Sequence, residues 1–298
     1  MSDFWASIKR QFAEGSSMIR LLYINVGVFV VLKLVSVCMM LFNVSPVVFQ
    51  SYLELPASLP LMIRQPWTLV TYMFMHLQVF HLFFNMLCLY WFGRIFLEYH
   101  SQKQLVGVYI LGGLGGALFF LLAYNLFPYF RGEVYTSFLL GASASIMGVI
   151  VSAAMAAPNY PVRLFLLGEF KLKYMAVVMV LVSMLGVTSD NAGGEFAHLG
   201  GAFVGYLYAV SLRRGKDLSR PESKLIDKLT NLFRRKPKVK VYKDNRKYHY
   251  AKSDAEYNQE KAANNAAIDK ILDKIKRSGY ESLTAEEKRQ LFDRSRNL

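Results

Sequence analysis

The sequence predicts an all-α polytopic membrane protein, in which a bundle of six transmembrane helices precedes a small soluble helical hairpin at the C-terminus. Three observations indicate this class. Hydrophobic residues make up 54% of the 298 residues. They gather in six apolar runs within the first two thirds of the chain, and 24 of the 35 Lys and Arg residues lie from Arg213 onward. An apolar, nearly neutral part followed by a polar and basic part is typical of a membrane domain with a cytoplasmic tail.

Six apolar runs are the candidate transmembrane helices. A helix needs about 20 mostly apolar residues to cross the hydrocarbon core of a bilayer. The last three runs are short or rich in Gly, Ala and Ser, and a buried helix of a soluble protein would explain one of them. It would not explain six in series. The runs cover residues 21–42, 79–96, 105–127, 138–157, 172–187 and 196–212.

The distribution of Lys and Arg predicts the orientation of these helices, because basic residues favour cytoplasmic loops. They occur in residues 1–20, in the loops after the second and fourth runs, and throughout the tail. The alternate loops hold only Arg64 and Arg131. Both termini are therefore expected in the cytoplasm. The loop over residues 43–77 is apolar but broken by prolines, so it is expected to lie in the outer interface as short amphipathic pieces.

Composition divides the chain into four parts. They are a cytoplasmic N-terminal segment (1–20), a six-helix membrane domain (21–213), a basic linker (214–258) and a small cytoplasmic helical hairpin (259–298). In the linker, basic residues alternate with aromatic ones, which raises nucleic acid as a partner. A polybasic segment beside a membrane is attracted to anionic headgroups by about 1 kcal/mol per residue. Contact with membrane lipid is therefore favoured, and no nucleic acid partner is expected.

The last part of the chain carries signals for two helices. Gly279 is a helix-stop signal, and Thr284 and Glu287 form a capping box that starts a second helix. A unit of this size has little core of its own, so it is expected to need a partner. The apolar residues expected to close the hairpin are Ile268, Ile271, Leu272, Ile275, Tyr280, Leu283, Leu291 and Phe292.

Polar residues in the membrane part meet at one depth. Histidine within a bilayer is costly and is therefore a functional candidate. His76 and His81 lie at the outer start of the second run, and Asn85 is one helical turn below His81. Ser143 and His198 lie near the outer starts of the fourth and sixth runs. All three runs point inward in the predicted topology, so these side chains are expected at a similar distance below the outer surface.

This set of residues is suited to acyl transfer. A serine hydroxyl is a weak nucleophile and needs a base within hydrogen-bond reach. His198 is the candidate base, which takes the proton of Ser143 and later passes it to the leaving amine. The tetrahedral oxyanion needs donors placed in advance. Asn85, His81 and the backbone N–H of Ser143 are the candidate donors.

Two serines compete for the role of nucleophile. Gly141, Ser145 and Gly148 are spaced at i, i+4 and i+7, so they are expected to share a small-residue face that packs against another helix. Ser143 is rotated by about 200° from Ser145, onto the face of Met147. The spacing therefore favours Ser143 as the nucleophile.

Each residue also has a purely structural interpretation. Serines in membrane helices commonly bond to their own backbone or to a neighbouring helix, and Gly201-x-x-x-Gly205 is a helix-packing motif. Only the combination of these polar residues at one depth favours a catalytic role. Asp190 and Glu195 precede the sixth run, but no pattern places either of them behind His198. No acidic residue is therefore an obvious third member of the set.

These motifs resemble those of the rhomboid family of intramembrane serine proteases, over about residues 15–213. Three blocks carry the resemblance: "HLQVFHLFFN" with His76, His81 and Asn85, "GASASIMG" with Gly141, Ser143 and Met147, and "AHLGGAFVG" with His198, Gly201 and Gly205. The chain departs from the family in three places, because Ala144, Met147 and Thr68 stand where Gly, Tyr and Arg are usual.

The resemblance implies a rhomboid-like six-helix core with a Ser143–His198 dyad, no metal and no cofactor. It further implies that the protein cleaves transmembrane protein substrates within or beside the membrane. The expected location is the cytoplasmic (inner) membrane of a bacterium, with the active site opening to the outer side. The C-terminal hairpin is similar to modules appended to some bacterial members.

Two other functions are compatible with some of these features. One is a catalytically weak rhomboid-like protein that binds or chaperones membrane clients. It has no need to keep Ser143, His198, His81 and Asn85 together. The other is a proton-coupled transporter, which would need charged residues in several further helices. Only Lys33 lies in the middle of a run, so neither alternative is favoured.

Overall fold

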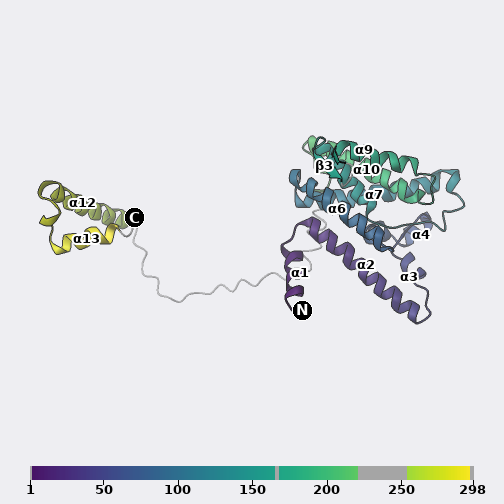
Figure 1. Ribbon diagram of the computed structural model, residues 1–298, viewed down its shortest axis with the longest axis horizontal. Helices are drawn as coiled ribbons and strands as arrows, with labels where there is room; N and C mark the ends of the chain where they lie inside the picture. The colour runs from purple at the N-terminus through teal and green to yellow at the C-terminus, as the bar shows by residue number, and fades with distance from the viewer. Residues whose placement is uncertain (1, 165–167, 221–253, 296–298) are drawn as a thin grey trace. The chain divides into compact units, whose positions relative to one another are not determined.

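The computed structural model describes residues 2–164, 168–220 and 254–295 (Figure 1). The chain forms two compact units, Met1–Arg235 and Lys236–Leu298. Within the described residues, three helices are long and apolar enough to cross a membrane: α2 (Ser17–Leu41), α6 (Val79–Tyr99) and α7 (Gln102–Leu126). The remaining long helices of the first unit are α1 (Ser2–Glu14), α8 (Ser143–Ala156), α9 (Leu172–Leu185) and α10 (Ala192–Arg213).

Each of the six predicted runs overlaps one helix, but α8 and α9 have only 14 residues each. A 14-residue helix is about 21 Å long, which is less than the hydrocarbon thickness of about 30 Å. The predicted count of six crossings therefore remains a prediction. The helices are mostly apolar all round, as expected for segments that face either lipid or other helices.

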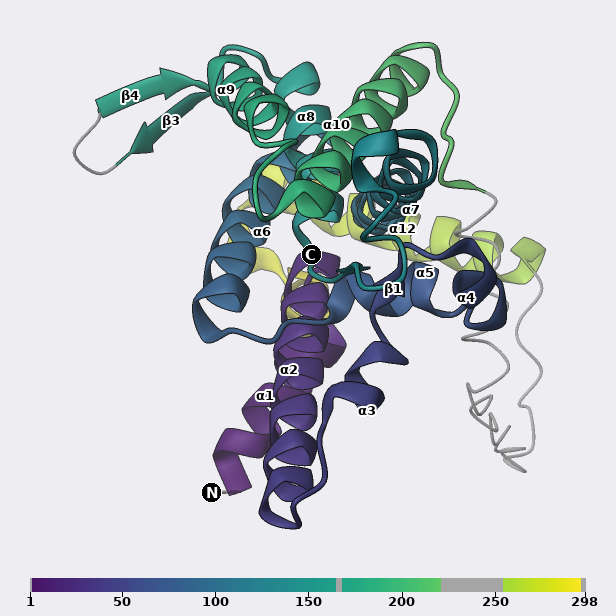
Figure 2. The same ribbon diagram turned by 90° about the vertical axis from the view of Figure 1, so that its right-hand side faces the viewer.

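Helices α7, α8 and α10 form the centre of the first unit, and each of them packs against the other two (Figure 2). Glycines allow their backbones to approach closely. A Cβ atom on Gly201 would overlap the carbonyl oxygen of Ala144, and one on Gly205 would overlap that of Gly148. A Cβ on Gly148 would lie 3.1 Å from Cα of Gly112 in α7. The predicted packing role of Gly201 and Gly205 is therefore seen directly in the contact between α10 and α8.

Two short sheets depart from the all-α prediction. Strand β2 (Phe138–Leu139) pairs antiparallel with β1 (Leu55–Pro56), and β3 (Pro161–Leu164) pairs with β4 (Gly168–Lys171) before α9. The fourth run was thus predicted to be helical from residue 138, but α8 begins five residues later. The strand pairs with the loop that follows α2, which holds this part of the chain extended.

The turn between β2 and α8 corrects a second prediction. Gly141 has φ +115°, a conformation that side chains other than glycine rarely adopt. It therefore lies outside the helix and cannot share a face with Ser145 and Gly148. Ser145 and Gly148 do face α7. A Cβ on Gly113 of α7 would lie 2.6 Å from Oγ of Ser145, and Gly148 contacts Gly112 of α7 as described above.

The loop between α2 and α6 is divided into short pieces, as predicted. Besides β1 it contains α3 (Val47–Ser51), α4 (Leu59–Arg64), α5 (Thr68–Thr71) and the 3₁₀ helix η1 (Tyr72–Phe74). Its predicted place in the outer interface remains a prediction. The Trp67 indole N–H donates to the carbonyl oxygen of Tyr52 at 2.7 Å, and the Thr71 hydroxyl donates to that of Leu53 at 2.8 Å. These bonds anchor the loop although Thr68 stands where the related motif has arginine.

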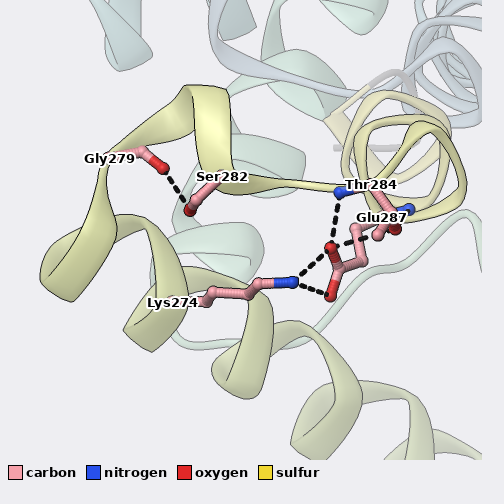
Figure 3. Close-up of polar contacts among 5 residues, drawn as sticks. All are labelled: Lys274, Gly279, Ser282, Thr284 and Glu287. Atoms are coloured by element: carbon pink, nitrogen blue, oxygen red, sulfur yellow. Dashed lines mark hydrogen bonds and ion pairs between the residues drawn. The ribbon is translucent and has the colours of Figure 1, made fainter.

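The second unit contains α12 (Asp254–Ser278), η3 (Tyr280–Ser282) and α13 (Ala285–Ser295). Gly279 ends α12 with φ +75°, as its stop signal predicted. The capping box is also confirmed, because the Thr284 N–H donates to Glu287 Oε2 at 2.7 Å and the Glu287 N–H donates to Thr284 Oγ1 at 3.3 Å (Figure 3).

The Glu287 carboxylate also joins the two helices of this unit, because Lys274 Nζ of α12 lies 2.8 Å from Glu287 Oε2. The Lys274 ammonium and the Thr284 N–H together lower the pKa of Glu287 to about 2.

Among the apolar residues expected to close the predicted hairpin, Ile271 and Leu283 are buried. Leu272, Tyr280 and Phe292 are exposed. Most of the basic linker, residues 221–253, lies outside the described residues.

Candidate active site

A cavity of about 300 Å³ opens between α6, α8, α9 and α10. Its polar lining comes from Asn85 on α6, Ser143 on α8, Ser183 on α9, and Glu195 and His198 on α10. Most of the other lining residues are apolar, among them the predicted supporting residue Met147. Three of the four predicted reacting residues thus share one cavity. Weak screening by apolar surroundings makes interactions between these polar groups stronger than they would be in water.

Ser143 is the first residue of α8 and is partly exposed, whereas the following residues to Ile150 are buried. Ser145 is fully buried, and its hydroxyl has no hydrogen-bond partner among the described residues. The first N–H groups of a helix have no partners within the helix. The backbone N–H groups at the start of α8 are therefore available as donors beside the Ser143 hydroxyl.

Asn85 lines the same cavity as Ser143, but its side-chain amide donates to the carbonyl oxygen of His81 at 2.8 Å. His81 instead lines a second cavity of about 450 Å³ together with residues of the segments that precede α8 and α10. Gly141 lies between the His81 ring and the Ser143 hydroxyl, because a Cβ there would lie 2.8 Å from Cε1 of His81 and 3.9 Å from Oγ of Ser143. The absence of a side chain at Gly141 keeps the His81 ring close to Ser143.

His76 is fully buried and supports the turn before the candidate nucleophile. Its Nε2 accepts a hydrogen bond from the backbone N–H of Ala142 at 3.4 Å. Its ring centroid lies 5.1 Å from that of His81, with the two rings edge to face. His76 therefore connects the His81 ring to the backbone that carries Ser143, but it does not line the cavity itself.

His198 has an acidic neighbour that sequence reasoning did not place there. Its Nδ1 lies 3.2 Å from Oε2 of Glu195 and 3.2 Å from the hydroxyl of Ser183. The apolar run that predicts the sixth helix begins at residue 196, so the sequence predicts Glu195 in the preceding loop. Because α10 begins at Ala192, Glu195 and His198 are spaced i, i+3 within the helix and share one face. The three-residue spacing of Glu195 and His198 indicates this contact only if both residues belong to one helix, and the apolar run did not include Glu195.

Comparisons with known proteins agree with these motifs. A family model described as the Rhomboid domain matches residues 63–215, and a family of unknown function (DUF6576) matches residues 252–297. The chain is 27% identical to the rhomboid protease AarA of Providencia stuartii over 159 residues, which are 49% of this chain and 55% of that protein.

Two plant proteins are similarly related. The identity is 25% over 158 residues to the mitochondrial RHOMBOID-like protein 12 of Arabidopsis thaliana, covering 50% of this chain and 47% of the relative. It is 30% over 152 residues to RHOMBOID-like protein 7 of the same plant, covering 50% and 44%. The chain therefore spans about half the length of the curated relatives it matches.

Proposed function

The chain belongs to the rhomboid family, and on that premise we propose that it is an intramembrane serine endopeptidase. It cleaves transmembrane or juxtamembrane segments of other membrane proteins through Ser143 and His198. The observation that carries this proposal is the shared cavity, in which a partly exposed serine at a helix start meets a histidine and an asparagine among apolar side chains. The rhomboid domain and the apolar helices make the protein an integral membrane protein.

The proposed reaction follows from the groups in the cavity. Ser143 Oγ attacks the carbonyl carbon of the scissile peptide bond while His198 Nε2 accepts the hydroxyl proton. The carbonyl oxygen becomes an oxyanion, which accepts hydrogen bonds from the first N–H groups of α8 and from the Asn85 amide. His198 then gives its proton to the leaving nitrogen. A water molecule, activated in the same way, hydrolyses the acyl-enzyme and restores Ser143.

The substrate must extend locally before this reaction, because the peptide bonds of a transmembrane helix are enclosed in its own hydrogen bonds. We propose six crossings, both termini in the cytoplasm and an active site open to the outer side of a bacterial cytoplasmic membrane. The charge pattern of the loops supports this orientation. In the same scheme the basic linker (214–258) contacts anionic headgroups, and the cytoplasmic hairpin (259–298) follows it.

The proposal is tested with purified protein in liposomes, given a panel of reporter proteins whose transmembrane segments contain helix-destabilising residues. We expect cleavage at one site within or beside the segment, detected by mass spectrometry of the products. A folded protein that cuts no reporter but still binds some of them would favour the alternative, a rhomboid-like protein that binds or chaperones membrane clients.

Asn85 is expected to act in the transition state rather than in binding. Replacing Asn85 with alanine should lower kcat by about 10²-fold and leave KM nearly unchanged, because one oxyanion donor is lost. Asn125 is a control of the same chemistry, since its amide also donates to a carbonyl oxygen one turn earlier in its own helix, that of Leu121 at 2.8 Å, and in addition to that of Ala57 at 2.9 Å. It does not line the cavity, so Asn125→Ala should keep kcat. Equal activity of Asn85→Ala and wild type would remove Asn85 from the oxyanion site.

A further inference from the structure

We propose that Glu195 is a positioning residue for His198: its carboxylate accepts the Nδ1–H of the imidazole and thereby leaves Nε2 free to take the proton of Ser143. The inference rests on the proposed function, because it assigns the third member of the same site. It replaces the predicted dyad with a Ser143–His198–Glu195 arrangement.

The carboxylate of Glu195 is held on both sides. Oε2 lies 3.2 Å from His198 Nδ1, and Oε1 accepts a hydrogen bond from the Asn191 side-chain amide at 3.4 Å. The side chains of His198 and Glu195 are only 20% and 17% exposed. Both belong to the first two turns of α10, so the rigid helix fixes their separation. A carboxylate that is mostly removed from water and bonded at both oxygens has little freedom to turn elsewhere.

Gly186 provides the space that this carboxylate occupies. It follows the last residue of α9, and a Cβ atom there would lie 2.8 Å from Cγ and 3.0 Å from Cδ of Glu195. The backbone of Gly186 has φ −84° and ψ −1°, which any residue can adopt. Glycine is therefore not needed for the turn itself. Its missing side chain is explained by the Glu195 side chain that passes over it.

The chemistry of the two neighbours of Nδ1 differs. A neutral imidazole carries its proton on one nitrogen, and the hydrogen bond at the other nitrogen decides which. The Ser183 hydroxyl both donates and accepts, so it does not select a tautomer. An ionised carboxylate only accepts, so Glu195 requires the proton on Nδ1. The same negative charge stabilises the imidazolium that forms when Ser143 loses its proton.

A purely structural role is the competing explanation. Glu195 lies in the first turn of α10, where a negative charge stabilises the helix dipole. That role predicts a lower melting temperature for a neutral variant and no specific loss of kcat. The positioning role predicts a specific loss of kcat with a nearly unchanged melting temperature. Melting temperature and kcat are therefore measured on the same preparations.

The test compares Glu195→Gln with wild type in liposomes. The glutamine amide can donate to Nδ1 and so favour the wrong tautomer. We expect kcat to fall about 10²-fold with KM unchanged, which is less than the roughly 10⁴-fold loss in a buried Ser-His-Asp triad, because this pair is partly exposed. Glu98→Gln is the matched control, since it also neutralises a carboxylate that is bonded to a side chain, the Tyr160 hydroxyl at 3.3 Å, but does not line the cavity. It should keep kcat.

Gly186→Ala tests the same idea without altering a polar group. The new methyl group displaces Glu195, so kcat should fall about tenfold, and the double variant Gly186→Ala/Glu195→Gln should be no slower than Glu195→Gln alone. If the two substitutions lowered kcat independently, so that the loss in the double variant equalled the product of the single losses, positioning by Glu195 would be contradicted.

The rate at which a fluorophosphonate probe labels Ser143 gives a readout that needs no peptide substrate. Slower labelling of Glu195→Gln supports the inference even if no reporter is cleaved. Equal labelling and equal kcat overturn it while leaving the proposed protease function intact. A lower melting temperature with unchanged kcat also overturns it, in favour of the helix-dipole role.

Discussion

Replacing Ser143 with alanine is expected to reduce cleavage of a transmembrane reporter by about 10⁴-fold or more, to the background rate. The residual rate after loss of a nucleophile comes only from binding and oxyanion stabilisation. Ser143 is the partly exposed residue at the start of α8 and lines the cavity with His198. His198→Ala should give a similar loss. The double variant should be no slower than either single variant, since the two groups act as a unit.

Ser145 provides the matched control two residues away. Its side chain is fully buried against α7, and its hydroxyl has no partner among the described residues. Removing such a hydroxyl leaves no polar group unpaired, so Ser145→Ala should fold and cleave within a few-fold of wild type. Loss of activity in Ser145→Ala, with activity kept in Ser143→Ala, would move the nucleophile to Ser145. Melting curves of all variants exclude misfolding as the cause.

The sequence predicted the helices and the candidate nucleophile through two local signals. Apolar runs located the helices, and Ser143 and His198 lie near the starts of runs that are predicted to point inward, which gave them a similar expected depth. Both signals depend on residues close in sequence. The structure agrees that Ser143, His198 and Asn85 line one cavity.

The parts that could not be predicted depend on partners distant in sequence or on where a helix begins. Strand β2 forms only because it pairs with Leu55 and Pro56, about 80 residues earlier. Gly141, with its positive φ, follows this strand by two residues and lies beside the His81 ring, which is about 60 residues earlier in the chain. The sequence does not reveal the role of Glu195, because the apolar run begins at residue 196, four residues after the start of α10. Hydropathy marks where a helix becomes apolar, and α10 begins with a polar turn.

Introducing a side chain at Gly201 is expected to be the most destabilising single change in the membrane unit. A Cβ atom there would overlap the carbonyl oxygen and the backbone carbon of Ala144, neither of which can rotate away. The backbones of α8 and α10 must then separate. Overpacking commonly costs about 1–3 kcal/mol, and a collision with backbone belongs at or above the upper end. We expect Gly201→Val to lose most folded protein in detergent, and Gly201→Ala to melt at a clearly lower temperature.

The same change should impair catalysis even in the fraction that folds, because Ala144 is bonded directly to Ser143. A shift of about 1 Å in a reacting group can lower the rate by about 10²-fold. Gly27→Ala in α2 is the control, since a Cβ there meets no atom within 4 Å. It should be neutral or stabilising by about 0.5–1 kcal/mol, as alanine is the better helix former. If Gly201→Val melted like wild type and cleaved at the same rate, the close α8–α10 contact would be wrong, and with it the cavity that Ser143 and His198 share.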